Sequence, residues 1–226
     1  MKRFLKQAAL IAGKDLAIEL STGEIVTTSG FFAVLVAVIA SLAFFAGQEA
    51  TEGVAPGVIW VSVAFASVLA VGRTWQRERE ENALAGLLVL PVSRGAIFVG
   101  KAVSVAIFVG LVEAIVVPVS ALLFSVDLIR MGPGLLLIAL FATPGIAAVG
   151  TLFGAMTVRT RARDLVLASV FFPLLAPTLL AAVAGTRELF GGAETSELFD
   201  YLALMGVFGT VFTAGGVGLF DTLIDG

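Results

Sequence analysis

The chain has 226 residues, of which 59% are hydrophobic and 14% are charged, and its mean hydropathy is +1.07. A soluble domain averages about 45–50% apolar and about 25% charged residues, so this composition indicates an integral membrane protein. The sequence contains no cysteine and no histidine, which excludes disulfides, thiolate metal sites and histidine-dependent nucleophilic chemistry. The net charge of -3 and the lack of a long basic run give no indication of nucleic-acid binding.

Residues 1–26 are interpreted as an amphipathic helix in the cytoplasmic membrane interface, and not as a signal peptide or a span. The apolar run from Ala8 to Ala12 is too short for the hydrophobic region of a signal peptide. Apolar residues recur at helical spacing between Leu5 and Leu20, and the basic residues off this stripe would meet anionic lipid. The alternative is a solvated leader.

Six apolar runs are long enough to cross a hydrocarbon core, which requires about 20 residues of helix. Because lipid offers no partner to an unpaired backbone amide, each run is expected to be an α-helix. The whole chain, residues 1–226, is therefore expected to form one all-α integral membrane domain. The predicted transmembrane helices are residues 28–46, 54–72, 96–124, 134–158, 165–185 and 198–220.

The distribution of lysine and arginine predicts the orientation of these spans. Of the 14 basic residues, only Arg130 and Arg187 lie in the first, third and fifth connections, which leaves 14 − 2 = 12 for the other side. Short cytoplasmic connections carry the excess of basic residues. The N-terminus is therefore expected in the cytoplasm, and an even number of spans returns the C-terminus there.

Residues 73–95, between the second and third spans, are expected to form a cytoplasmic coupling loop. The first half is charged, and the second half is rich in leucine and ends at a proline. Since carboxylates favour a helix N-terminus and proline ends a helix, the pattern predicts a short amphipathic helix that docks into a groove on a soluble partner. A solvated loop is the alternative. The candidate docking residues are Glu78, Glu80, Glu81, Leu84, Leu87, Leu88 and Pro91.

Glu113 is the one carboxylate deep inside a predicted span. A charge at the centre of a membrane helix costs about 2.5–3.5 kcal/mol on insertion scales, so we expect a neutral form or a polar partner. Two interpretations stay open at this point. Glu113 could serve a proton relay or a substrate cavity, or it could simply bond to a neighbouring helix through Ser104, Ser120 or Thr143.

The segment from Gly95 to Lys101 spells G-x-x-x-x-G-K, the start of a phosphate-binding loop. Such a loop needs a preceding strand and a serine or threonine after the lysine. Ala102 occupies that position here, and the segment begins a span. Lys101 is therefore interpreted as an anchor at the cytoplasmic interface, with its aliphatic stem in the lipid.

Other residues in the spans are expected to have structural roles. Trp60, Trp75 and Tyr201 lie where interfacial anchors are common. The Gly150–Gly154 pair, separated by three residues, predicts a helix-packing face. Prolines inside spans kink or break helices, which would suit a lined cavity. The prolines in question are Pro118, Pro144, Pro173 and Pro177.

Several of these segments together resemble the CcmB family, the haem exporter protein B permeases. The similar features are the Ala55-Pro56-Gly57-Val58-Ile59-Trp60 start of the second span, the charged loop, the leucine-rich stretch up to Pro91, Gly100-Lys101, and Thr143-Pro144-Gly145 in the fourth span. They extend over nearly the whole chain. The resemblance implies a six-span ABC-2-type permease in the inner (cytoplasmic) membrane.

The resemblance also implies a function and partners. The chain would be the non-catalytic permease subunit of an ABC transporter for cytochrome c maturation, which exports haem or releases the haem chaperone. Its partners would be a CcmA-like ATPase that hydrolyses ATP, CcmC- and CcmD-like membrane subunits and a CcmE-like chaperone, with a second permease copy left open. Without histidine the chain is expected to bind no cofactor of its own, and partners would ligate haem.

Two other functions remain alternatives. The same loop is typical of ABC-2 exporters of a lipid, a drug or a polysaccharide. A membrane scaffold that has no ATPase partner would require only the spans. An intramembrane enzyme is disfavoured, because Glu113 has no second carboxylate near it in a span and the chain has no histidine or cysteine.

Overall fold

The computed structural model describes residues 2–44, 48–80, 83–157 and 163–225. Within these ranges the secondary structure is helical. Six of the described helices, α2, α3, α5, α6, α7 and α8, are long and apolar enough to cross a membrane, which confirms the predicted number of spans. The elements are α1 (Lys2–Thr22), α2 (Glu24–Ala43), α3 (Gln48–Glu80), α4 (Ala83–Val89), α5 (Arg94–Leu123), α6 (Leu128–Thr157), α7 (Arg163–Phe190), the 3₁₀ turn η1 (Thr195–Leu198) and α8 (Phe199–Asp225).

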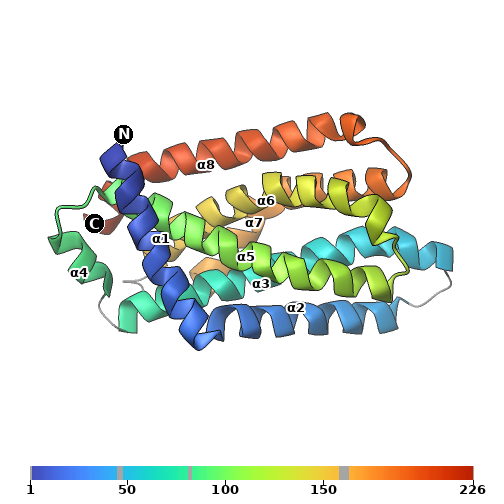
Figure 1. Ribbon diagram of the computed structural model, residues 1–226, viewed down its shortest axis with the longest axis horizontal. Coiled ribbons are helices and arrows are strands. Elements are labelled where there is room, and N and C mark those ends of the chain that lie inside the picture. The colour runs from blue at the N-terminus through green and yellow to red at the C-terminus, as the bar shows by residue number, and fades with distance from the viewer. Residues whose placement is uncertain (1, 45–47, 81–82, 158–162, 226) are drawn as a thin grey trace.

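The six long helices lie side by side, and α1 crosses them at the end of the bundle where both chain termini lie (Figure 1). The short α4 is at the same end. Helix α3 occupies the middle, because it packs against α2, α5, α6 and α7. Helix α8 packs against α5, α6 and α7. We call the end that carries α1 and both termini the α1 end.

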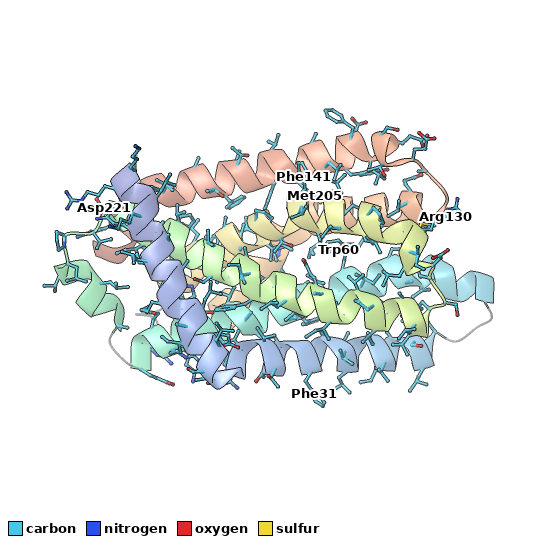
Figure 2. All side chains as sticks on the ribbon, in the orientation of Figure 1. Phe31, Trp60, Arg130, Phe141, Met205 and Asp221 are labelled. Carbon is cyan, nitrogen blue, oxygen red and sulfur yellow. The ribbon has the colours of Figure 1, made fainter. Side chains whose placement is uncertain are left out.

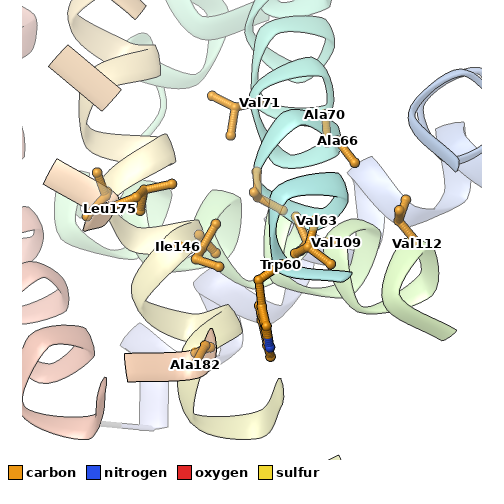
Figure 3. Packing of buried hydrophobic residues seen from close by; sticks show 14 of the residues in the cluster. Trp60, Val63, Ala66, Ala70, Val71, Val109, Val112, Ile146, Leu175 and Ala182 are labelled. Atoms are coloured by element: carbon orange, nitrogen blue, oxygen red, sulfur yellow. The ribbon is translucent and has the colours of Figure 1, made fainter. Parts of the chain in front are cut away.

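The core is built around α3, which is buried along most of its length. Figure 3 shows Val63, Ala66 and Ala70 of α3 among side chains of α5, α6 and α7. Trp60 is also buried, and its indole N–H donates a hydrogen bond of 2.8 Å to the Thr186 hydroxyl of α7. In a bilayer such packing and interhelical hydrogen bonding hold helices together, since lipid is as apolar as the side chains.

The Gly150–Gly154 pair forms the packing face that its spacing predicts. A side chain at Gly150 would meet Val71 of α3, and a side chain at Gly154 would overlap the ring of Trp75. The two glycines therefore let α6 approach α3 closely.

A single glycine separates α1 from α2. Gly23 has a φ of 62°, a left-handed conformation that glycine adopts without steric cost. The side chain of Glu19 then accepts a hydrogen bond of 2.8 Å from the Val26 N–H in the first turn of α2. This bond satisfies one of the free N–H groups at a helix start, so the change of direction is stabilised locally.

Several sequence-based boundaries are wrong. The segment from Arg73 to Glu80 continues α3 and is not part of a loop, so of the predicted coupling segment 73–95 only α4 and its short connections lie between α3 and α5. Three charged residues in this part of α3, Arg73, Arg77 and Glu78, have ion-pair partners on neighbouring helices. The first span begins at Glu24. The second span begins at Gly53, close to the predicted residue 54, but helix α3 already begins at Gln48, so Pro56 lies inside the helix and does not start it.

The expected anchors differ from the structure, and no helix breaks at the prolines named above. Trp60 and Trp75 are buried in the bundle (Trp60 in Figure 2) and are not interfacial anchors. Tyr201 is half-buried against Gly185. The helices continue through their prolines, because neighbouring helices can compensate for a lost backbone bond in a membrane bundle.

Candidate functional site

A cluster of buried charges joins three helices at the α1 end. The ammonium group of Lys101 on α5 is 1% exposed and lies between two carboxylates, those of Asp15 on α1 and Glu78 on α3. The Asp15 carboxylate is 2.8 Å away, and Glu78 accepts a hydrogen bond from the same ammonium. The Lys14 ammonium reaches Glu78 at 2.8 Å. We call Lys14, Asp15, Glu78 and Lys101 the charged cluster.

The interpretation of Lys101 as a lipid-facing anchor is therefore wrong. The adjacent Gly100 explains how α1 comes close enough to bury this lysine. A Cβ atom at Gly100 would lie 2.7 Å from the Ala8 carbonyl oxygen and 2.8 Å from Ile11, distances that side chains do not tolerate. Gly100 thus permits the close contact between α1 and α5. This contact brings Lys101 within ion-pair distance of Asp15.

A second group of ion pairs lies beside the charged cluster and ties α3 to the α1–α2 turn. Arg73 reaches Glu24 at 3.2 Å, and Arg77 reaches Glu24 at 3.4 Å and Glu19 at 3.9 Å. Glu24 is half-exposed, so its pairs contribute little stability by themselves. Their arrangement nevertheless fixes the last two turns of α3 against α1 and α2.

The charged cluster changes the titration of its outermost member. Burial lowers the pKa of Lys14, but the hydrogen bond to Glu78 and the charges of Asp15 and Glu78 outweigh burial, so the pKa lies above that of an ordinary lysine. Lys14 is therefore a cation at physiological pH.

The predicted docking residues whose side chains the structure describes differ in exposure. Glu78 is buried in the charged cluster, Glu80 and Pro91 are exposed, and Leu87 is half-buried against the core. Glu81 lies outside the described residues, as do the side chains of Leu84 and Leu88. The Pro91 carbonyl accepts a hydrogen bond of 3.2 Å from the Gln7 side chain, so the end of the α4 segment is tied to α1.

Sequence reasoning missed Asp15 and Glu19. The predicted stripe of α1 ran from Leu5 to Leu20, but those two leucines are exposed. The inward face is made by Ala8, Ile11, Ala12, Asp15 and Glu19. Residues four apart share a helix face, so the Asp15–Glu19 spacing was the available signal. Buried carboxylates look improbable until the matching cations on other helices are known.

Glu113 is buried between two membrane helices. The Thr143 hydroxyl of α6 lies 2.8 and 2.9 Å from the two carboxyl oxygens. The hydrogen bond to a neighbouring helix is thereby confirmed for Thr143. Ser104 instead donates to the Gly100 carbonyl oxygen. The proton-relay interpretation of Glu113 stays a prediction.

Glu113 also lines an apolar groove between α5 and α6. The groove has a volume of about 620 Å³, and Thr213 of α8 lies at its edge. Pro118 and Pro144 line it as well. Its walls include the exposed side chains of Val103 and Ile107, so the groove is accessible from outside the bundle. We call it the α5–α6 groove.

These features define a class: a multi-pass helical protein of the cell membrane that has a buried charged cluster at one end and an apolar groove along its side. The family model described as CcmB protein matches residues 6–215, which is most of the chain. The chain belongs to the CcmB family.

Curated relatives agree with this assignment. Heme exporter protein B of Pseudomonas aeruginosa is 25% identical over 173 residues, which are 76% of this chain and 77% of the relative. The protein of the same name from Paracoccus denitrificans is 29% identical over 154 residues, 66% of this chain and 68% of the relative. That of Haemophilus influenzae is 24% identical over 187 residues, 80% of this chain and 84% of the relative.

Proposed function

We propose that this chain is the membrane permease subunit of an ABC transporter that exports haem, or releases a haem chaperone, during cytochrome c maturation. Its CcmB family membership and the name heme exporter protein B of its relatives support this function. The α1 end is proposed to face the cytoplasm, because basic residues concentrate there whereas Arg130 lies at the opposite end (Figure 2).

The charged cluster is the observation that carries the mechanism. It joins the end of α3 to α1 and to the start of α5, and α4 lies in the connection between α3 and α5. Separating buried charges leaves each one uncompensated, which is strongly unfavourable. A push on α4 by a cytoplasmic ATPase would therefore move the ends of α3, α5 and α1 together.

In this mechanism the chain transmits motion and does no bond chemistry. ATP is hydrolysed on the partner ATPase, and haem is cargo of the complex. The chain has no histidine or cysteine with which to ligate haem iron, so CcmC-, CcmD- or CcmE-like partners would supply the axial ligands. Coupling would proceed through the exposed part of α4 and Glu80, with Leu84, Leu87 and Leu88 as the apolar contacts.

The test is deletion of the gene, haem staining of membrane c-type cytochromes, and complementation. The intact chain should restore covalent haem. A Leu87→Asp, Leu88→Asp double variant should insert into the membrane but neither restore haem nor co-purify with the ATPase. Ile129→Asp controls for the addition of a carboxylate on an exposed position at the opposite end, since Ile129 is 93% exposed, and it should behave like the intact chain.

Three outcomes would contradict the proposal. Normal c-type cytochromes in the deletion strain would overturn the maturation role and favour a generic ABC-2 exporter of lipid, drug or polysaccharide. Retention of the ATPase by the double variant would show that another surface makes the contact, and absence of any bound ATPase in the intact chain would favour a scaffold.

A further inference from the structure

One side chain of α1 holds the connection between α4 and α5. This connection comprises residues 90–93. The side-chain amide of Gln7 donates a hydrogen bond of 3.2 Å to the Pro91 carbonyl oxygen. Its own oxygen accepts bonds of 3.4 Å from the backbone N–H and from the hydroxyl group of Ser93. Gln7 therefore binds the connection through both halves of its amide group.

The chemistry of the connection explains why a glutamine suits this position. Backbone N–H and C=O groups need hydrogen-bond partners, and the connection presents a C=O at Pro91 and an N–H at Ser93. Its own backbone bonds, donated by Leu90 and Val92, use neither group. A side-chain amide carries a donor and an acceptor in one plane, so Gln7 can satisfy both groups at once.

Gln7 belongs to the part of α1 that packs closely against α5. A Cβ atom at Gly95 would lie 3.5 Å from the ring of Phe4, about one helical turn before Gln7. The close contact at Gly100 involves Ala8, the residue directly after Gln7. The charged cluster then fixes the middle of α1. Gln7 is thus carried by a helix that is held on both sides of it.

Helix α4 has few other contacts that could fix its position. It lies at the margin of the α1 end (Figure 1) and packs against α3. It has seven residues, and isolated helices shorter than about 12 residues are marginal in water. Val89, its last residue, is 86% exposed. The position of α4 therefore depends strongly on the connection that Gln7 binds.

We propose that Gln7 is a positioning residue for coupling, and that its amide holds α4 in the orientation that the partner ATPase contacts. This inference deepens the proposed function and rests on it, because α4 is the segment on which the ATPase is proposed to act. The charged cluster joins α1 to α3 and α5. Gln7 adds a separate link, since it joins α1 to the connection that carries α4.

The test measures the position of α4. The chain contains no cysteine, so spin labels attach only at introduced cysteines. One label is placed by Val89→Cys at the end of α4 and the other by Phe31→Cys on α2, where the native side chain is 71% exposed. Pulsed electron paramagnetic resonance on the full chain in lipid nanodiscs gives the distribution of distances between the labels. With Gln7 present, one main peak is expected.

Substitutions of Gln7 should widen this distribution. Gln7→Leu removes the donor and the acceptor, so the ratio of molecules outside the main peak to those inside it should rise about fivefold, the change expected from one net hydrogen bond. Gln7→Glu keeps an acceptor for Ser93 but places a carboxylate oxygen against the Pro91 carbonyl, and the ratio should rise as well. If Gln7→Leu does not accumulate, Gln7→Glu decides.

Ser21→Ala is the matched control on the same helix. The Ser21 hydroxyl donates a hydrogen bond of 2.7 Å to the Ile18 carbonyl oxygen, so this bond stays within α1. Its loss should leave the distance distribution unchanged.

The unlabelled variants are then compared in the deletion strain at equal amounts of chain in the membrane. Gln7→Leu should restore about fivefold less covalent haem than the intact chain, in line with the smaller share of correctly positioned α4. Ser21→Ala should restore it fully.

Three results would overturn the proposal. One is a distance distribution that Gln7→Leu and Gln7→Glu leave unchanged. Another is full restoration of covalent haem by Gln7→Leu despite a widened distribution. The third is an equal effect of Ser21→Ala. If the intact chain itself restored no haem, the proposed function would fail, and with it the role of α4 in coupling. The distance distributions would then still decide whether Gln7 holds α4 in place.

Discussion

Two regions of this molecule bury carboxyl groups in contrasting ways. In the charged cluster, Asp15 and Glu78 surround the ammonium of Lys101, and Lys14 adds a second cation. In the α5–α6 groove, Glu113 has the Thr143 hydroxyl and no lining cation among the described residues. The carboxyl groups are thus paired with cations in the first region and with a hydroxyl group in the second.

This difference separates an ion-paired cluster from a carboxyl group whose described partner is a single hydroxyl. A buried charge is tolerated when it is paired and hydrogen-bonded. In the charged cluster each carboxylate lies against at least one ammonium group, which compensates its charge within the chain. Glu113 has no such cation among the described residues that line the groove, and both of its carboxyl oxygens lie within hydrogen-bonding distance of the Thr143 hydroxyl.

The largest expected effect on stability follows from removing the central cation of the charged cluster, Lys101. Lys101→Met would leave Asp15 and Glu78 buried with Lys14 as their remaining cation in the cluster, and should cost about 3–5 kcal/mol of stability. The measurement is the midpoint of thermal unfolding in detergent. Arg94→Met is the control, because its pair with Asp221 is partly exposed and should contribute at most about 1 kcal/mol. Equal shifts for both variants would contradict the central role of Lys101.

A smaller effect on stability is expected from two glycine substitutions, one in a closed helix contact and one in the open groove. Gly154→Leu places a side chain against Trp75 and should cost about 1–3 kcal/mol through overpacking. Gly110→Leu has open space and should leave stability equal or higher, since glycine within a helix costs roughly 0.5–1 kcal/mol. Comparing both unfolding midpoints tests this. If Gly110→Leu destabilised as much as Gly154→Leu, the groove would not be open.

The smallest effect concerns how the contribution of Lys14 to the stability of the folded chain depends on pH. Because its pKa is raised in the folded chain, its contribution to stability should be complete below the ordinary lysine value of about 10.4 and lost as the pH rises through the raised pKa. The difference in unfolding midpoint between the intact chain and Lys14→Met should therefore stay constant from neutral pH up to that value and shrink above it. A difference that grows with alkaline pH would contradict this assignment.

Parts of the site could be predicted from the sequence, and the remainder depended on partners far along the chain. Glu113 was identifiable because a carboxylate inside an apolar run is costly, and Thr143 was one of three partners considered. Lys101 and Glu78 were singled out, but for surface roles. Their pairing connects residues 23 positions apart, and no local pattern contains that information.

Composition and hydropathy alone determined that this is a membrane protein with six helical spans, because twenty apolar residues in a row have few other stable arrangements. They also determined the absence of histidine and cysteine chemistry. Tertiary structure decided which charges face inward. The burial of Lys101, Asp15 and Glu78 depends on α1, α3 and α5 meeting, with α1 close to α5 at Gly100. A contact between distant segments is set by packing and not by local spacing.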